Sequence, residues 1–114
     1  MSRRSPITTH VLDLGSGLPA AGMAVILEQR SGDAWQRLAE GRTDADGRLI
    51  DWYQVDTPAG IYRLTFATEA YYDAQGKACF YPEVCISFRL SDPGVHHHVP
   101  LLINRWGYST YRGS

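Results

Sequence analysis

Apolar and polar residues alternate along most of the chain, which is the pattern of half-buried β-strands. The segment 84–90 shows it most clearly, because Val84, Ile86, Phe88 and Leu90 fall on one face of an extended chain. The strands predicted from this alternation span residues 7–14, 23–29, 35–42, 48–52, 60–67, 84–90, 96–103 and 108–112.

Turn-forming residues separate these segments at intervals of about ten residues. Asp46-Gly47 and Pro93-Gly94 are typical of tight turns. Residues 68–76 break the alternation and predict a short helix, with Thr68 as its cap and Gly76 closing it in the left-handed conformation. Seven or eight short strands with a single short helix predict an all-β fold of the β-sandwich type.

Composition adds limits to this interpretation. A chain of 114 residues fits one domain, and we expect a flexible N-terminal extension at 1–6 followed by a single domain at 7–114. A net charge of -1 gives no electrostatic reason to expect nucleic acid or an anionic membrane as a partner. No secretory signal is visible, and no apolar run approaches the roughly 20 residues needed to span a bilayer. We therefore expect a soluble, cytoplasmic protein.

Three consecutive histidines, His96, His97 and His98, suggest a metal site at first sight. On a strand, however, His96 and His98 point to one face and His97 to the other, so the three rings cannot hold one ion together. Zinc sites usually have three or four protein ligands, and no neighbouring cysteine or carboxylate completes the set. We expect no metal and no cofactor, and we expect His97 to be exposed and inert.

Signatures of nucleophilic catalysis and phosphate binding are absent from the sequence. It contains no Gly-x-Ser-x-Gly motif and no phosphate-binding glycine loop, and neither Cys79 nor Cys85 has a local histidine arrangement indicating a reactive thiolate. If the chain is an enzyme, attack by an activated water is the plausible route, with histidine as the base and arginine as the electrophile.

Spacing alone does not assign such roles. His10 by itself is typical of a hydrogen-bonded structural residue, and Arg48 of a solvated charge. Near the end of the sequence, Tyr111, Arg112 and Ser114 offer a phenol, a planar donor fork and a hydroxyl. The same residues also fit a last strand followed by an unstructured end.

Five sequence blocks occur in an order that resembles one known family. "TTHVLDLGSGLPA", "TDADGR", "FYPEV", "HHHVPLL" and "GYSTYRGS" together resemble the transthyretin-like 5-hydroxyisourate hydrolases. The resemblance runs from residue 7 to residue 114, and the closing Tyr-Arg-Gly-Ser is its most specific part. The carrier transthyretin shares the sandwich and a similar "YST" segment, but it has a different, longer tail and lacks the catalytic histidines.

The resemblance implies a fold, an assembly and a reaction. The fold would be a transthyretin-like β-sandwich of two four-stranded sheets with one short helix. The assembly would be a homotetramer, a dimer of dimers, with active sites at the dimer–dimer interface. The reaction would be hydrolysis of 5-hydroxyisourate to 2-oxo-4-hydroxy-4-carboxy-5-ureidoimidazoline in urate degradation, without a cofactor.

The resemblance also assigns residues. His10, Arg48 and His98 match the catalytic positions, whereas Tyr111, Arg112, Gly113 and Ser114 match the substrate-binding tail. Which histidine is the base stays open. The chain departs from the usual family pattern in two places, with His97 where an aromatic such as tyrosine is common, and with Asn104-Arg105-Trp106 in the following linker.

Two other functions remain as alternatives. A non-catalytic carrier would use the same channel for a small aromatic ligand, and it would have no need for a base and an electrophile together. A purely structural sandwich module would leave the polar residues scattered rather than convergent.

Overall fold

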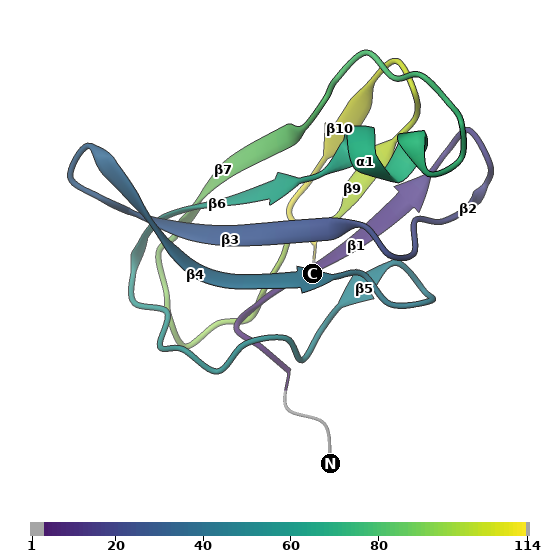
Figure 1. Cartoon of the computed structure of the whole chain (residues 1–114). Coiled ribbons are helices and arrows are strands. Elements are labelled where there is room, and N and C mark those ends of the chain that lie inside the picture. Colours follow the sequence, from purple (N-terminus) through teal and green to yellow (C-terminus); the bar gives the residue numbers. More distant parts are fainter. Residues whose placement is uncertain (1–3, 114) are drawn as a thin grey trace.

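Two β-sheets pack face to face in the computed structural model, which describes residues 4–113 (Figure 1). One sheet contains β1 (Ile7–Asp13), β2 (Leu18–Pro19), β5 (Arg48–Leu49), β8 (His97–His98), β9 (Leu101–Ile103) and β10 (Tyr108–Thr110). The other contains β3 (Ala24–Ser31), β4 (Ala34–Arg42), β6 (Gly60–Phe66) and β7 (Val84–Leu90). The helix α1 (Thr68–Asp73) follows β6. The predicted β-sandwich with one short helix is therefore confirmed.

The two sheets differ in strand number. The second has four strands, as expected, and their order is β4-β3-β6-β7. The first follows the path β10-β9-β1-β2, and the two-residue strands β5 and β8 also pair with β1, which makes six strands rather than four. Strand β1 thus pairs with four other strands and forms the centre of this sheet.

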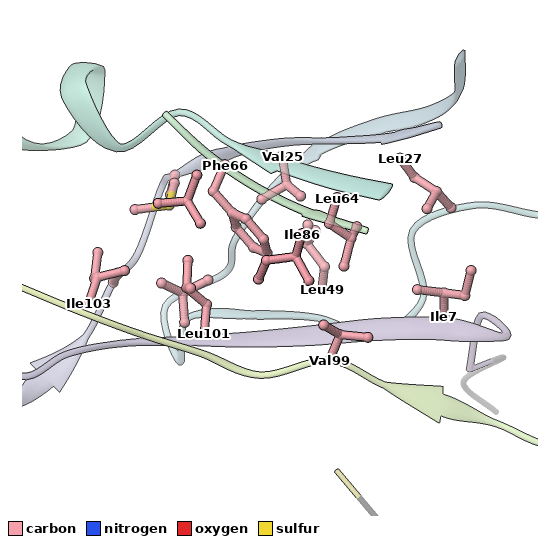
Figure 2. Close-up of a cluster of buried hydrophobic side chains, with 14 of the residues drawn as sticks. Ile7, Val25, Leu27, Leu49, Leu64, Phe66, Ile86, Val99, Leu101 and Ile103 are labelled. Atoms are coloured by element: carbon pink, nitrogen blue, oxygen red, sulfur yellow. The ribbon is translucent and has the colours of Figure 1, made fainter. Parts of the chain in front are cut away.

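The hydrophobic core fills the space between the sheets. Ile7, Leu101 and Ile103 from the first sheet point toward Leu64 and Phe66 from the second (Figure 2). Burying one such side chain stabilises a fold by about 1.5–3 kcal/mol. Alternation along β1 places Ile7 and Val11 in this core, so the even-numbered residues of β1 lie on the outer face of the sheet.

The segment predicted as one strand over 96–103 is divided into β8 and β9. The backbone N–H of Val99 still donates to the carbonyl of Thr8 at 2.9 Å, but the next residue is Pro100, which has no N–H to continue the ladder. The expectation that His97 is exposed was wrong. Its side chain is 5% exposed, and its Nδ1 lies 2.8 Å from the carbonyl oxygen of Val95.

The helix differs from its prediction at one end. Thr68 does not cap it, because its hydroxyl donates to the carbonyl of Tyr81 at 2.7 Å, and the N-cap position belongs to Ala67. At the other end Gly76 has a φ of 69°, the left-handed conformation that was predicted.

Residues at the start of the chain contact the sandwich from Ser5 onward. Ser5 is 1% exposed, and its hydroxyl donates to the carbonyl of Tyr53 at 3.0 Å. Residues 1–3 of the expected extension lie outside the described residues, so the domain boundaries remain a prediction. None of residues 4–113 forms a helix with the length and hydropathy needed to cross a bilayer.

Candidate active site

Strand β1 brings two of the three predicted catalytic residues together. His10 on β1 lies directly opposite Arg48 on the antiparallel strand β5. Residues that are paired in this way have Cβ atoms roughly 4.5–5.5 Å apart and project on the same face of the sheet. His10 and Arg48 are therefore neighbours on the outer face, although they lie 38 positions apart in the sequence.

A tight turn positions Arg48 at the start of β5. The carboxylate of Asp44 accepts the backbone N–H of Asp46 at 2.8 Å and that of Arg48 at 2.9 Å. Gly47 has a φ of 75°, and a Cβ at this position would overlap the carbonyl oxygen of Val11. Glycine is therefore required for β1 and this turn to approach closely enough for His10 to pair with Arg48.

His98 approaches the same face from the other edge of β1. Strand β8 runs parallel to β1 and pairs His98 with Thr8, which is two residues before His10. Residues two apart on a strand share a face. The structure therefore brings His10, Arg48 and His98 together on the outer face of the first sheet, from three different strands.

The hydroxyl of Thr8 connects two histidines. Its Oγ1 lies 2.7 Å from Nδ1 of His98 and 2.8 Å from Nε2 of His96. The two imidazole rings are stacked, with centroids 6.2 Å apart and planes inclined by 28°. The side chain of Thr8 is fully buried under these rings.

Burial and neighbouring positive charge act on both predicted catalytic histidines. Burial lowers the pKa of His98 from its usual 6.5, and the charges of His96, Arg48 and His10 lower it further. The pKa of His10 is also lowered, first by burial and then by Arg48. Asp44 and Asp46 oppose this effect without reversing it. Both rings are therefore favoured in the neutral form, which can accept a proton.

The C-terminal segment returns to His98. The backbone N–H of Gly113 donates to the carbonyl of His98 at 2.8 Å, and the two residues form an isolated β-bridge. A Cβ on Gly113 would lie 2.6 Å from Cδ2 of the His98 ring. The backbone at residue 113 therefore packs directly on the imidazole, and only glycine fits there without movement.

A cavity of about 320 Å³ lies between the edges of the two sheets. Tyr111 and Arg112 line it together with His98, and β7 forms its other side. His10 and Arg48 do not line this cavity, and Ser114 lies outside the described residues. A second cavity, of about 250 Å³, is bordered by α1 and β3 and contains none of the predicted site residues.

Two residues of this cluster were not assigned from the sequence. Thr8 lies two residues before His10, and His96 lies two residues before His98, so each shares a strand face with a predicted catalytic histidine. That parity was the available signal, but the parallel pairing of β1 with β8 was needed to join the two pairs. Within residues 4–113, no group of three or more histidine, cysteine, aspartate or glutamate side chains is arranged to hold a metal ion.

Comparison with known proteins decides the family. The sequence model of the HIUase/Transthyretin family matches residues 7–113. The chain belongs to this family. A 5-hydroxyisourate hydrolase of Caulobacter vibrioides is 47% identical over 114 residues, covering 96% of this chain and 99% of the relative. A 5-hydroxyisourate hydrolase of Mus musculus is 42% identical over 115 residues, covering 96% of each.

Solved structures of the family resemble the whole sandwich. The 5-hydroxyisourate hydrolase of Klebsiella pneumoniae superimposes with a TM-score of 0.84 at 37% identity, covering 95% of this chain and 98% of that one. Transthyretin of Sparus aurata gives a TM-score of 0.90 at 32% identity, covering 96% and 97%. Because both proteins share the fold, the fold alone does not separate the family's hydrolases from its transthyretins.

Proposed function

We propose that the chain hydrolyses 5-hydroxyisourate to 2-oxo-4-hydroxy-4-carboxy-5-ureidoimidazoline, a step of urate degradation. The chain is an enzyme of the hydroxyisourate hydrolase class, to which its relatives at 41–47% identity belong. The observation that carries the proposal is the convergence of His10, Arg48 and His98 on one face of the sheet. A structural module would not need this convergence, and a carrier would not need a base beside an arginine.

The reaction begins with a water molecule attacking the carbonyl carbon of the scissile C–N bond. A neutral imidazole, His98 or His10, takes a proton from this water as its oxygen bonds to carbon. The leaving nitrogen of the substrate then takes that proton back from the imidazolium as the C–N bond breaks, so the histidine is neutral again and the products are an opened ring and a carboxylic acid. The lowered pKa of both histidines supports this role, because a ring that is already protonated cannot act as base. General base help of this kind is typically worth about 100- to 10,000-fold in rate.

Arg48 stabilises the negative charge that develops on the carbonyl oxygen. Its guanidinium carries a positive charge, five N–H donors and no acceptor. Its pairing with His10 and its charge effect on His98 support a place between the two rings. One well-placed donor to such an oxyanion is worth roughly 3–4 kcal/mol.

The C-terminal residues bind the substrate. Tyr111 and Arg112 border the cavity that reaches His98, and Gly113 packs on the His98 ring. Their donors suit a flat ring that is rich in carbonyl oxygens and nitrogens. Ser114 completes this set in the proposal.

The active site is shared between subunits of a homotetramer. His10, Arg48 and His98 lie on an outer sheet face where Arg48 is exposed, so one subunit alone gives the site little cover. A second dimer packed on this face supplies the missing wall. Tyr111 lines the cavity beside His98 and is 58% exposed, which supports such an interface.

The test is to add the purified chain to freshly generated 5-hydroxyisourate and identify the product by 13C NMR before it decays. The proposal expects the ureidoimidazoline product to form well ahead of the spontaneous reaction. Binding of a small aromatic ligand without any acceleration would instead favour the carrier.

A further inference from the structure

We propose that Thr8 and His96 are positioning residues that hold the proton of the neutral His98 ring on Nδ1, which leaves Nε2 free to act as the base. The inference rests on the proposed function of His98. It adds two residues outside the predicted set and decides which nitrogen of His98 accepts the water proton.

The hydroxyl of Thr8 can be hydrogen-bonded to the two imidazole rings in only a few ways. Its Oγ1 is within 2.8 Å of one nitrogen on each ring, and a hydroxyl has a single hydrogen to donate. If that hydrogen goes to His96 Nε2, then His98 Nδ1 must carry a hydrogen and donate it to Oγ1. If it goes to His98 Nδ1, then His98 must carry its proton on Nε2, where it blocks the base.

The burial of Thr8 removes other arrangements. Its side chain is 0% exposed, so bulk water does not compete for the hydroxyl. Two rings that both donated to Oγ1 would leave the hydroxyl hydrogen buried without an acceptor, which is unfavourable. The hydroxyl therefore acts as a switch between two states, and its direction sets the tautomer of His98.

Only one of these states is compatible with turnover. When His98 Nε2 takes a proton, Nδ1 already donates to Thr8 and the hydroxyl already points at His96, so no bond has to change. In the opposite state Nδ1 of His98 accepts the Thr8 hydroxyl hydrogen. A second proton on His98 would have to bind at Nδ1, and it would break that hydrogen bond. His96 must then be a neutral acceptor, and burial together with the charges of Arg4 and His97 lowers its pKa in the required direction.

The two partners of His98 therefore have different expected effects when removed. Without an acceptor at residue 96, the Thr8 hydroxyl turns and donates to His98 Nδ1, which drives the proton to Nε2. Without the hydroxyl at residue 8, Nδ1 loses its partner and the preference disappears. Within residues 4–113, the other titratable or charged groups that act on His98 or line its cavity come from β1, β5, β7, β8 and the segment after β10: His10, Arg48, Arg89, His97, Tyr111 and Arg112.

Four variants of the full chain separate these effects. Thr8→Val removes the hydroxyl at nearly constant shape, and Thr8→Ser restores it. His96→Phe keeps a ring without an acceptor, and His96→Gln restores an acceptor oxygen. The matched control is Thr9→Val, because Thr9 is a fully buried neighbour on the same strand whose hydroxyl donates to the carbonyl of Val99 at 2.6 Å and contacts no histidine.

The first readout is the tautomer of His98, measured by 15N NMR of the ring nitrogens without substrate. We expect a protonated Nδ1 in the wild type, in Thr8→Ser, in His96→Gln and in the Thr9→Val control, and a shift of the proton toward Nε2 in His96→Phe. A wild-type ring with its proton on Nε2, or an unchanged ring in both Thr8→Val and His96→Phe, would overturn the inference. This readout needs no turnover, so it can fail while the proposed function stands.

The second readout is kcat on freshly generated 5-hydroxyisourate. We expect kcat to fall by at least about tenfold in Thr8→Val and His96→Phe, with KM little changed, and by no more than the roughly 100- to 10,000-fold that the general base itself is worth. Thr8→Ser and His96→Gln should restore kcat, and Thr9→Val should lower only the melting temperature. If Thr9→Val loses kcat as much as Thr8→Val does, the effect belongs to strand stability and the inference is wrong.

Discussion

Gly113 and His98 pack against each other without space for an added methyl group. The amide of Gly113 donates to the carbonyl of His98 at 2.8 Å, and a Cβ on residue 113 would lie 2.6 Å from Cδ2 and 3.2 Å from Cγ of the imidazole. The chain near its C-terminal end therefore holds the position of a ring in the proposed active site.

Substituting Gly113 should consequently impair catalysis more than stability. We expect Gly113→Ala to displace the His98 ring and to lower kcat by about 100-fold, the effect of a small misplacement of a catalytic group. The melting temperature should change little, because this bridge lies outside the core. The check is turnover of 5-hydroxyisourate beside a thermal melt.

Gly107→Ala is the matched control for this substitution. Gly107 also lies in the C-terminal segment, but its added Cβ would meet only Asn104 Oδ1, at 4.0 Å. Wild-type turnover in Gly113→Ala, or an equal loss in Gly107→Ala, would remove the specific role of the contact with His98.

The titration of His98 should follow its surroundings. Burial and the charges of His96, Arg48 and His10 lower its pKa, so we expect NMR titration to give a value below the usual 6.5. Arg48→Met removes one of these charges and should raise the pKa of His98 toward 6.5. Arg37→Met, on the distant strand β4, should leave the pKa unchanged. A His98 pKa above 6.5 in the wild type would contradict this account of the electrostatics.

Stability should decrease on the acid side of neutrality. The pKa values of His10, His96 and His98 are all lowered in the folded state, so below pH 6.5 the unfolded chain binds more protons than the folded one. Above pH 6.5 these histidines should therefore cause no change in the free energy of unfolding with pH. Below pH 6.5 the free energy of unfolding should fall as the pH drops. Urea unfolding of the wild type and His98→Phe at several pH values checks this, and the variant should show the weaker pH dependence. Equal dependence in the two proteins would exclude His98 as a contributor.

Alternation in the sequence was enough to predict most of the strands. Both 60–67 and 84–90 alternate between core and solvent, so both were predicted as strands. The bounds of 84–90 match the structure, and 60–67 was too long by one residue. Periodicity reports which residues share a face, however, and not what covers that face. His97 was therefore placed correctly opposite its neighbours but wrongly in solvent.

The arrangement of the site could be predicted only in part. The resemblance to the family supplied His10, Arg48 and His98, and their grouping on one face depends on pairings of β1 with β5 and β8 that alternation does not specify. The Thr8 hydroxyl reaches a ring 90 positions away at His98, and no local pattern indicates such a contact. Thr68 shows the same limit, because its hydroxyl bonds to the distant Tyr81 rather than capping its own helix.

The most direct test of the central claim compares the loss of 5-hydroxyisourate absorbance in the wild type, His98→Ala and Arg48→Ala with the spontaneous decay. Circular dichroism and the oligomeric state of each variant should be measured alongside, so that lost activity is not confused with lost structure. We predict a rapid loss with the wild type, and a rate close to spontaneous decay with both variants while their fold is retained. Near wild-type rates in either folded variant would contradict the assignment of the site.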